Sequence, residues 1–376
     1  MKLLYIVNSS SFFCSHFLKL ACRMHSKGIE VMVACGDSDS QHLIENEGLI
    51  FKCVKIDRKS KSITKEMYSL LNIYKLIKDF SPDIIHNFTI KPVIYTNLIF
   101  KLFFSKSNIK VVSSITGLGS SYLATSLLGK LTWVLIKSLY KFSLNHKESL
   151  VIFENPDDRD VFLQFDIVNG NMCKIVEGAG IDTKEFFPKL RIDNSKFVVT
   201  LVSRLLGDKG IREYIEAGKI ISSLEFNDVQ LNLVGDVDLN NISSLSLDEV
   251  NNADVNGYIK YLGRRSDICH IYQESNVACL PSYREGLPKS LIEAAACGLP
   301  IITTDVPGCR QMVVHQNGIL IPARDPKALA DAILFMRSNQ KSIEIMGEKS
   351  RLMALNHFDY SVILQRFEHI YGFCDR

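Results

Sequence analysis

Residues 281–307 contain a turn, a helix and a strand that follow an earlier strand, an order typical of a parallel β-sheet covered by helices. An apolar run closes at Leu280, and Pro288 stands where the first residue of a helix tolerates proline. Gly298 then ends the helix, and residues 301–304 form the next buried apolar run. The segment therefore predicts an α/β protein.

Two glutamates in this segment suggest a ligand. Glu285 lies in the turn, and Glu293 lies about one and a half turns into the helix. This separation lets both side chains point to one side, with the free N–H groups of the helix N-terminus between them. Carboxylates hydrogen-bond sugar hydroxyls, and the N–H groups suit a phosphate.

The alternation of strands and helices begins twice in the chain. Residues 2–7, a helical pattern at 14–25 and residues 29–35 form one strand, helix and strand unit, and residues 197–204 begin another. A chain of 376 residues that is 47% hydrophobic can bury two cores, so two domains are expected. The glycine fingerprint of dinucleotide-binding enzymes does not occur in the first turn, which argues against a dehydrogenase.

The charge is unevenly divided. Residues 1–150 hold 20 Lys and Arg against 10 Asp and Glu, whereas the remainder holds 24 against 31. A basic N-terminal region favours an anionic partner. It carries no zinc-finger spacing, RNA-binding signature or recognition-helix pattern, so acidic lipid headgroups or a diphosphate-linked acceptor are favoured over nucleic acid.

The sequence contains no run of 18 uncharged apolar residues, and Met1 leads directly into a strand-like segment rather than a signal peptide. A cytosolic or peripheral protein is expected. The ten cysteines include no CxxC pair, which favours reduced, buried thiols over a disulfide framework or a metal site.

The spacing of Glu285 and Glu293, with Gly-Leu after the first and Ala after the second, resembles the signature of the family 4 retaining glycosyltransferases, which are of the GT-B type. Other segments follow in that family's order: VSRLLGDKG at 202–210, LNLVGDVD at 231–238, 260–282 and 317–333. The resemblance implies two Rossmann-like, doubly wound domains that face a cleft. It implies an acceptor-binding domain at 1–187, a nucleotide-sugar-binding domain at 188–357, and a helix at 358–376 that crosses back to the first domain.

The same resemblance implies a donor site. Arg204 and Lys209 would stabilise the leaving diphosphate, Glu285 would hold hydroxyls of the transferred sugar, and Glu293 would bind the ribose. The other donor-binding candidates are Gly235, Arg264, Gly286, Leu287, Lys289 and Ser290. Pro288 and Lys289 replace a Phe-Gly pair common in other branches. Because Pro288 has no N–H, Lys289 or Ser290 is expected to contact the diphosphate instead.

Residues 83–92 and 113–121 resemble the subgroup that builds O-antigen and capsule repeat units on polyprenyl diphosphate. His86 ends a strand and is expected to point toward the ligand crevice, which makes it a candidate catalytic side chain besides Arg204, Lys209 and Glu285. A hydrogen-bonded structural histidine is the alternative. The candidate acceptor-binding residues are Ser9, Ser10, Ser11, His86, Lys91, Thr116, Gly117 and Gly119.

Residues 121–147 are apolar and aromatic, with Lys130, Lys137 and Lys141 on one edge of the expected helix. A helix lying on an anionic membrane surface has this pattern, and so does a helix packed on a sheet with its lysines in water. The first alternative places the protein peripherally on the inner face of the cytoplasmic membrane.

Asp-x-Asp patterns, which hold metal ions in some sugar transferases, occur at 37–39 and 236–238. We interpret these aspartates as turn and cap residues, because the resemblance is to metal-independent enzymes and no third ligand is evident. No metal ion or cofactor is expected.

These features predict a retaining glycosyltransferase that moves a hexose or N-acetylhexosamine from a nucleotide sugar, with a UDP-sugar favoured, to a polyprenyl-diphosphate-linked saccharide. The alternatives are a nucleotide-sugar 2-epimerase of the same fold and a soluble transferase with a small acceptor. A non-enzymatic lipid-binding or nucleotide-sugar-binding protein is the least favoured function.

Overall fold

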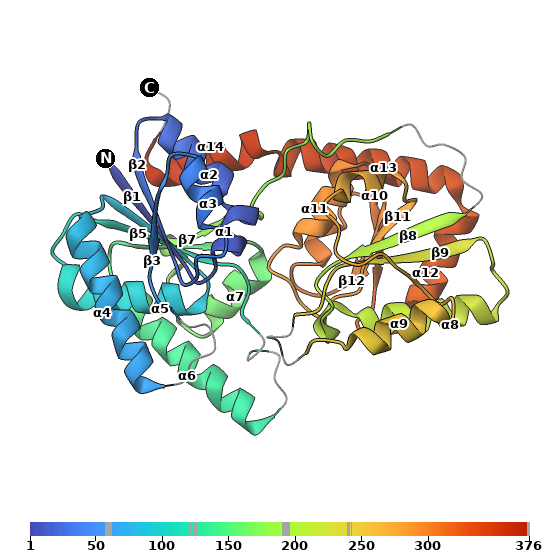
Figure 1. The fold of residues 1–376 in the computed structure, drawn as a ribbon, viewed down its shortest axis with the longest axis horizontal. Helices are drawn as coiled ribbons and strands as arrows, with labels where there is room; N and C mark the ends of the chain where they lie inside the picture. The colour runs from blue at the N-terminus through green and yellow to red at the C-terminus, as the bar shows by residue number, and fades with distance from the viewer. Residues whose placement is uncertain are drawn as a thin grey trace. The chain divides into compact units, whose positions relative to one another are not determined.

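The computed structural model describes residues 1–56, 62–119, 122, 126–189, 196–238, 241 and 243–373. The chain divides into two compact units (Figure 1). The first comprises Met1–Glu177 and Leu364–Arg376, and the second comprises Gly178–Ile363.

The first unit is built on a parallel sheet with the strand order β3-β2-β1-β4-β5-β6-β7. The interior strand β1 is apolar and buried along nearly its whole length, as expected for a strand covered on both faces. The strands are β1 (Lys2–Val7), β2 (Glu30–Cys35), β3 (Ile50–Cys53), β4 (Ile84–Phe88), β5 (Lys110–Ile115), β6 (Ser149–Phe153) and β7 (Cys173–Ile175).

Helices α1 to α3 and α14 lie on one side of this sheet, and α4, α5 and α6 lie together on the other (Figure 1). The helices are α1 (Ser10–His16), α2 (Leu18–Ser26), α3 (Gln41–Asn46), α4 (Ile63–Phe80), α5 (Ile90–Ile99), η1 (Phe100–Phe104), α6 (Leu127–Leu144), α7 (Pro156–Gln164), η2 (Gly170–Met172) and α14 (Tyr360–Tyr371). No helix within the described residues is long and apolar enough to cross a membrane.

The second unit repeats the architecture, with a parallel sheet in the order β10-β9-β8-β11-β12-β13. Its strands are β8 (Phe197–Val202), β9 (Val229–Val234), β10 (Lys260–Tyr261), β11 (Val277–Leu280), β12 (Ile301–Thr304) and β13 (Gly318–Ile321). Its helices are η3 (Gly207–Lys209), α8 (Ile211–Ser223), α9 (Leu247–Val255), α10 (Ile268–Gln273), α11 (Lys289–Ala296), η4 (Arg310–Met312), α12 (Pro326–Ser338), α13 (Gln340–Met353) and η5 (Ala354–Phe358).

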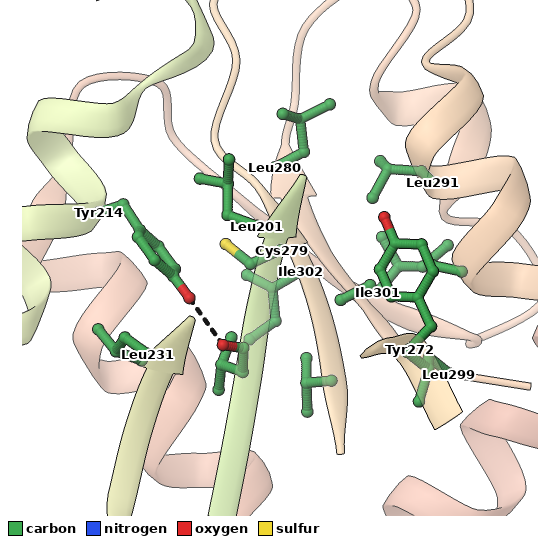
Figure 2. Close-up of a cluster of buried hydrophobic side chains, with 14 of the residues drawn as sticks. Leu201, Tyr214, Leu231, Tyr272, Cys279, Leu280, Leu291, Leu299, Ile301 and Ile302 are labelled. Atoms are coloured by element: carbon green, nitrogen blue, oxygen red, sulfur yellow. Dashed lines mark hydrogen bonds between the residues drawn. The ribbon is translucent and has the colours of Figure 1, made fainter. Parts of the chain in front are cut away.

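Side chains from the central strands and from α8, α10 and α11 form the core of this unit (Figure 2). The buried Tyr214 hydroxyl donates to the Val199 carbonyl at 2.8 Å and to the Asn232 carbonyl at 3.1 Å, which joins α8 to β8 and β9. The two parallel, helix-covered sheets confirm the prediction of two Rossmann-like domains.

The structure divides the chain after Glu177, whereas the sequence analysis places the boundary after residue 187. Residues 178–187 group with the second unit because they are attached to it. Ile181 pairs with Asp359 as an isolated bridge, and the Arg351 guanidinium donates to the carbonyls of Thr183 and Phe186.

Helix α14 corresponds to the helix expected at the C-terminus. The expected C-terminal segment begins at residue 358, whereas the part that groups with the first unit begins at Leu364. The buried Glu368 carboxylate accepts from Arg23 at 2.7 Å and lies 2.9 Å from the Lys27 ammonium. These contacts attach the end of the chain to α2.

Candidate active site

A lysine and a glutamate from two loops of the second unit form a close ion pair. Lys209 ends η3, just after β8, and Glu285 lies between β11 and α11. The Lys209 Nζ atom lies 2.5 and 2.7 Å from the two carboxylate oxygens of Glu285, and both side chains are mostly buried. The Tyr283 N–H and the Ser282 hydroxyl donate to the Asp208 carbonyl at 2.9 and 3.0 Å, so the backbone also holds the loops together.

Two glycines allow this approach of the loops. Gly210 has a φ of 72°, and a Cβ atom there would lie 2.0 Å from the Pro281 carbonyl oxygen. Gly308 has a φ of 83°, and its Cβ would lie 2.3 Å from the Glu285 carbonyl oxygen. Any other residue at either position would push the loop that carries Glu285 away from its neighbours.

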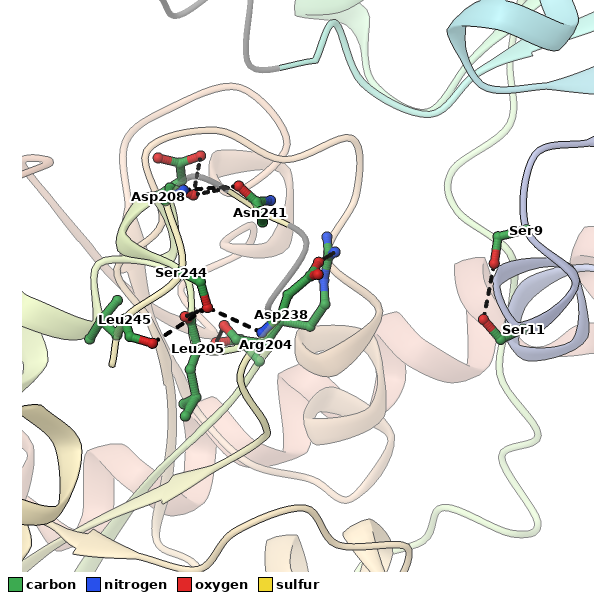
Figure 3. Close-up of polar contacts among 11 residues, drawn as sticks. Ser9, Ser11, Arg204, Leu205, Asp208, Asp238, Asn241, Ser244 and Leu245 are labelled. Carbon is green, nitrogen blue, oxygen red and sulfur yellow. Dashed lines mark hydrogen bonds and ion pairs between the residues drawn. The ribbon is translucent and has the colours of Figure 1, made fainter. Parts of the chain in front are cut away.

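Arg204 lies at the carboxyl end of β8 and pairs with Asp238, which follows β9 (Figure 3). The Arg204 Nη1 atom lies 2.7 Å from Asp238 Oδ2, and the arginine side chain is 52% exposed. Ser244 Oγ accepts from the Asp238 N–H at 3.1 Å and fixes the acidic partner. In the segment between β9 and Asp238, a Cβ on Gly235 would lie 1.8 Å from the Ser203 carbonyl oxygen. The guanidinium therefore stays accessible at a crowded turn.

The Asp-x-Asp pairs take part in local contacts. Asp236 accepts from the Val237 N–H at 2.8 Å, and Asp37 accepts from the Ser10 N–H at 2.9 Å. Within the residues that the structure describes, no three His, Cys, Asp or Glu side chains gather as a metal site would require.

Helix α11 places Glu293 beside Lys289, one turn earlier, with 3.5 Å between Nζ and Oε1. Burial raises the pKa of Glu293, and the Lys289 charge offsets part of that effect. The Ser290 carbonyl accepts from the Tyr272 hydroxyl at 2.8 Å, which fixes the first turn of the helix. Pro288, predicted to be the first helical residue, is the N-cap residue instead, and the helix begins one position later at Lys289. The Lys289 ammonium, expected to contact a diphosphate, thus has an internal carboxylate partner.

The remaining donor-site candidates differ in exposure. Gly286 is half-buried, and the side chain of Leu287 is buried against Gly178, whose Cβ position lies 3.2 Å from Leu287 Cδ2. Arg264 follows β10 and is exposed. The second unit therefore brings Arg204, Lys209, Glu285 and Glu293 to the loops and helix ends that follow its central strands, where doubly wound sheets bind ligands.

The structure also shows a support that the sequence analysis missed. The Tyr283 hydroxyl donates to Glu213 Oε1 at 2.6 Å, and the Arg324 guanidinium lies 4.6 Å from the centre of the Tyr283 ring. Tyr283 stands two residues before Glu285, so these contacts hold the loop in place. A tyrosine in a loop gives no sequence signal for partners 70 and 41 residues away.

In the first unit, the three serines expected to contact an acceptor have different roles. Ser9 is the N-cap of α1, and its hydroxyl lies 3.0 Å from that of Ser11, which is exposed (Figure 3). Ser10 is fully buried, donates to Asp37 and accepts from the Ser40 N–H at 2.9 Å. The prediction for Ser10 is wrong, because its hydroxyl joins the loops after β1 and β2 rather than facing a ligand.

His86 is also misassigned as a catalytic candidate. It lies within β4 and is fully buried, with Nδ1 2.6 Å from the Tyr371 hydroxyl and Nε2 2.7 Å from Ser114 Oγ. Burial lowers its pKa to about 3, so the ring is neutral at physiological pH. His86 is therefore a hydrogen-bonded structural histidine, which is the alternative interpretation, and its partner Tyr371 belongs to α14.

The remaining candidate acceptor-binding residues are Lys91 and three residues of the loop after β5. The Lys91 ammonium lies 2.6 Å from Oε1 of Glu66, and both side chains are about three-quarters buried. Thr116, Gly117 and Gly119 follow the carboxyl end of β5, and Gly119 is exposed. Lys91 is thus bound to an internal carboxylate, whereas the loop remains at the edge of the sheet where the strands end.

Two family descriptions match this chain. "Glycosyl transferases group 1" matches residues 182–353, and "Glycosyl transferase 4-like" matches residues 2–155. Together they cover β1 to β6 of the first sheet and every strand of the second.

Among similar proteins, the N,N'-diacetylbacillosaminyl-diphospho-undecaprenol alpha-1,3-N-acetylgalactosaminyltransferase of Campylobacter jejuni is 30% identical over 271 residues, 68% of this chain and 69% of the relative. The UDP-Gal:alpha-D-GlcNAc-diphosphoundecaprenol alpha-1,3-galactosyltransferase of Escherichia coli is 26% identical over 322 residues, 82% of this chain and 80% of the relative.

The fold also matches the crystal structure of Anabaena HepE in complex with UDP, with a TM-score of 0.78 and 17% identity over 99% of this chain and 100% of that one. The two parallel sheets, the paired glutamates and these matches lead to one conclusion: the chain belongs to the group 1, type 4 glycosyltransferases and has the GT-B fold.

Proposed function

We propose that the protein is a retaining transferase that moves a hexose or N-acetylhexosamine from a UDP-sugar to a polyprenyl-diphosphate-linked saccharide during the synthesis of a bacterial surface polysaccharide. The observation that carries this proposal is the placement of Arg204, Lys209 and Glu285 on the loops after the central strands of the second unit, and of Glu293 on helix α11, which follows one of these loops. The names of the Campylobacter and Escherichia relatives support the acceptor class.

In the proposed reaction, the Lys209 ammonium and the Arg204 guanidinium neutralise the diphosphate as its bond to the anomeric carbon breaks. Both cations already have carboxylate partners, Glu285 and Asp238, which the diphosphate would replace. An acceptor hydroxyl attacks the anomeric carbon from the face of the leaving group, and its proton passes to the leaving phosphate oxygen. No side-chain nucleophile and no metal ion take part.

The paired glutamates have different tasks in this scheme. Glu285 holds hydroxyls of the transferred sugar, and Glu293 binds the ribose hydroxyls through its two oxygens. Burial of Glu293 on α11 favours a role in binding, because burial of a carboxylate is costly and the Lys289 charge offsets only part of that cost.

We further propose that the first unit binds the acceptor at the inner face of the cytoplasmic membrane. Helix α6 is held by buried residues near its end, including Tyr140 and Leu144, while much of its remaining apolar surface is exposed. The exposed apolar residues of α6 are Leu127, Leu128, Leu131, Val134, Leu135, Leu139 and Phe142. Lys130 and Lys141 are exposed on the same helix.

This exposure supports the membrane-surface alternative over a helix packed along its apolar side, because a packed helix buries its leucines. The neighbouring elements α4 and η1 add to the apolar surface through Ile63, Met67, Leu71, Leu102 and Phe103. The exposed Lys130 and Lys141 are suited to bind anionic headgroups. The Lys137 ammonium lies instead over the Phe165 ring, 4.3 Å from its centre.

The test is a transfer assay with purified protein, a polyprenyl-diphosphate-N-acetylhexosamine acceptor and a panel of UDP- and GDP-sugars, read by the mass of the acceptor. A gain of one sugar that is lost in Glu285→Ala and Arg204→Ala supports the proposal and identifies the donor. A nucleotide sugar that binds but is epimerised at C2, with no change in any acceptor, would replace it with the epimerase alternative.

A further inference from the structure

The carboxyl end of β4 holds polar side-chain atoms that lack partners among the described residues. Asn87 is fully buried, and neither its amide nitrogen nor its amide oxygen makes a hydrogen bond. Two residues later, the Thr89 Oγ1 atom is also buried and unpaired. Three hydrogen-bonding atoms are thus unsatisfied within three residues of the chain.

This arrangement costs stability. A buried polar group without a partner costs about 1–3 kcal/mol. Thr89 also has a φ of 68°, a conformation that a β-branched residue adopts only under strain. Thr89 is the N-cap of α5, yet its side chain accepts no hydrogen bond from the helix. The segment is therefore not explained by folding alone.

The location is the switch point of the first sheet. The strand order reverses between β1 and β4, and doubly wound sheets bind ligands outside the carboxyl ends of the strands at such a point. Asn87 pairs in register with Ile6, near the end of β1, and with Ser113 of β5. A Cβ on Gly119 would lie 2.8 Å from Ile90 Cδ1, so the loop after β5 approaches the residue that follows Thr89.

We propose that Asn87 and Thr89 form a polar subsite that positions the acceptor by hydrogen-bonding one of its sugar hydroxyls. A carboxamide and a threonine hydroxyl each donate and accept, as a sugar hydroxyl does. A phosphate oxygen only accepts, and it would leave the Asn87 oxygen unpaired, which favours a hydroxyl. This inference rests on the proposed function, because it takes the acceptor to bind the first unit.

The experiment compares wild type with Asn87→Leu and Thr89→Val in steady-state transfer to the polyprenyl-diphosphate-N-acetylhexosamine acceptor. Leucine removes the unpaired amide at similar volume, and valine keeps the β-branched shape of threonine without its hydroxyl. We expect kcat/KM for the acceptor to fall about tenfold or more in each variant, the effect of one lost hydrogen bond to substrate. The KM for the donor stays within twofold of wild type, and the melting temperature does not fall in Asn87→Leu.

Thr96→Val is the matched control, because Thr96 Oγ1 is also buried and unpaired but lies in the second turn of α5. It should leave kcat/KM for the acceptor unchanged. Wild-type kinetics in a folded Asn87→Leu protein would overturn the subsite alone; if that variant does not fold, Thr89→Val decides in the same way. A wild-type protein that transfers no sugar would overturn the proposed function and the subsite with it.

Discussion

The Lys209 ammonium lies within 2.7 Å of both carboxylate oxygens of Glu285. In the proposed reaction the same ammonium neutralises the donor diphosphate, and the same carboxylate holds the donor sugar. The internal pair keeps two mostly buried charges satisfied when no donor is bound, since either charge alone would be costly there. Donor binding then exchanges one partner for another on both side chains.

Replacement of Lys209 by methionine should lower kcat/KM for the donor by about 10²–10³-fold, the effect of removing one fixed electrostatic donor from a transition state. Initial rates over a range of UDP-sugar concentrations measure this change. Lys219→Met is the control, because Lys219 forms an exposed pair with Glu216 within α8. Equal rates for Lys209→Met and Lys219→Met would contradict the role given to Lys209.

The exposed leucines of α6 should carry membrane binding. Leu131→Ser is expected to weaken binding to vesicles of anionic phospholipid several-fold, because one large apolar side chain contributes about 1.5–3 kcal/mol when it leaves water completely. Sedimentation with vesicles of increasing phosphatidylglycerol content measures the partitioning.

Leu352→Ser supplies a matched control for this change. Leu352 lies on α13 of the second unit, and both leucines are 57% exposed. The loss of binding should be confined to Leu131→Ser. An equal loss in both variants, or none in either, would mean that α6 is not the membrane-binding surface.

The fold could be predicted from the sequence because its signals are local. Strands such as β1 and β8 are continuous apolar runs, and helices α7 and α12 begin with a capping Asn155 or Asp325 followed by proline. The paired glutamates also follow from local spacing, since a turn and a helix fix where they lie.

The contacts that decide the role of an individual side chain join residues that are far apart in the sequence. His86 in a strand is compatible with a ligand crevice or a buried pair, and its partner Tyr371 lies 285 residues away. Ser10 is bonded to Asp37 on the neighbouring strand's loop, and Arg204 to Asp238. Spacing within one element carries no information about such partners.

Arg351 should be among the residues most important for the stability of the second unit. Its guanidinium donates to the carbonyls of Thr183, Phe186 and Ala296 at 3.0, 2.9 and 2.6 Å, which ties residues 178–187 to the end of α11. Arg351→Ala leaves these carbonyls without their charged donor and should cost about 2–4 kcal/mol of unfolding free energy.

Urea denaturation followed by circular dichroism measures that loss. Arg265→Ala is the comparison, because Arg265 forms an exposed ion pair with Asp267, and water and salt screen such pairs so that they contribute little to stability. A loss in Arg351→Ala no larger than in Arg265→Ala would show that the three carbonyls are satisfied by water.

The buried His86 should make the first unit sensitive to acid. Its pKa is lowered to about 3 by burial, whereas the unfolded chain protonates this histidine below its ordinary value of 6.5. Between these values the unfolded state binds a proton that the native state does not, so the unfolding free energy decreases as the pH falls through this range. His86→Gln cannot titrate and should lose less stability over the same interval.

Trp133, the single tryptophan of the chain, lies in α6 and reports unfolding of this unit by fluorescence in urea. The two unfolding free energies should keep a constant difference above pH 7 and approach each other in acid, and parallel curves from pH 7 to pH 4 would show that His86 is protonated equally in both states.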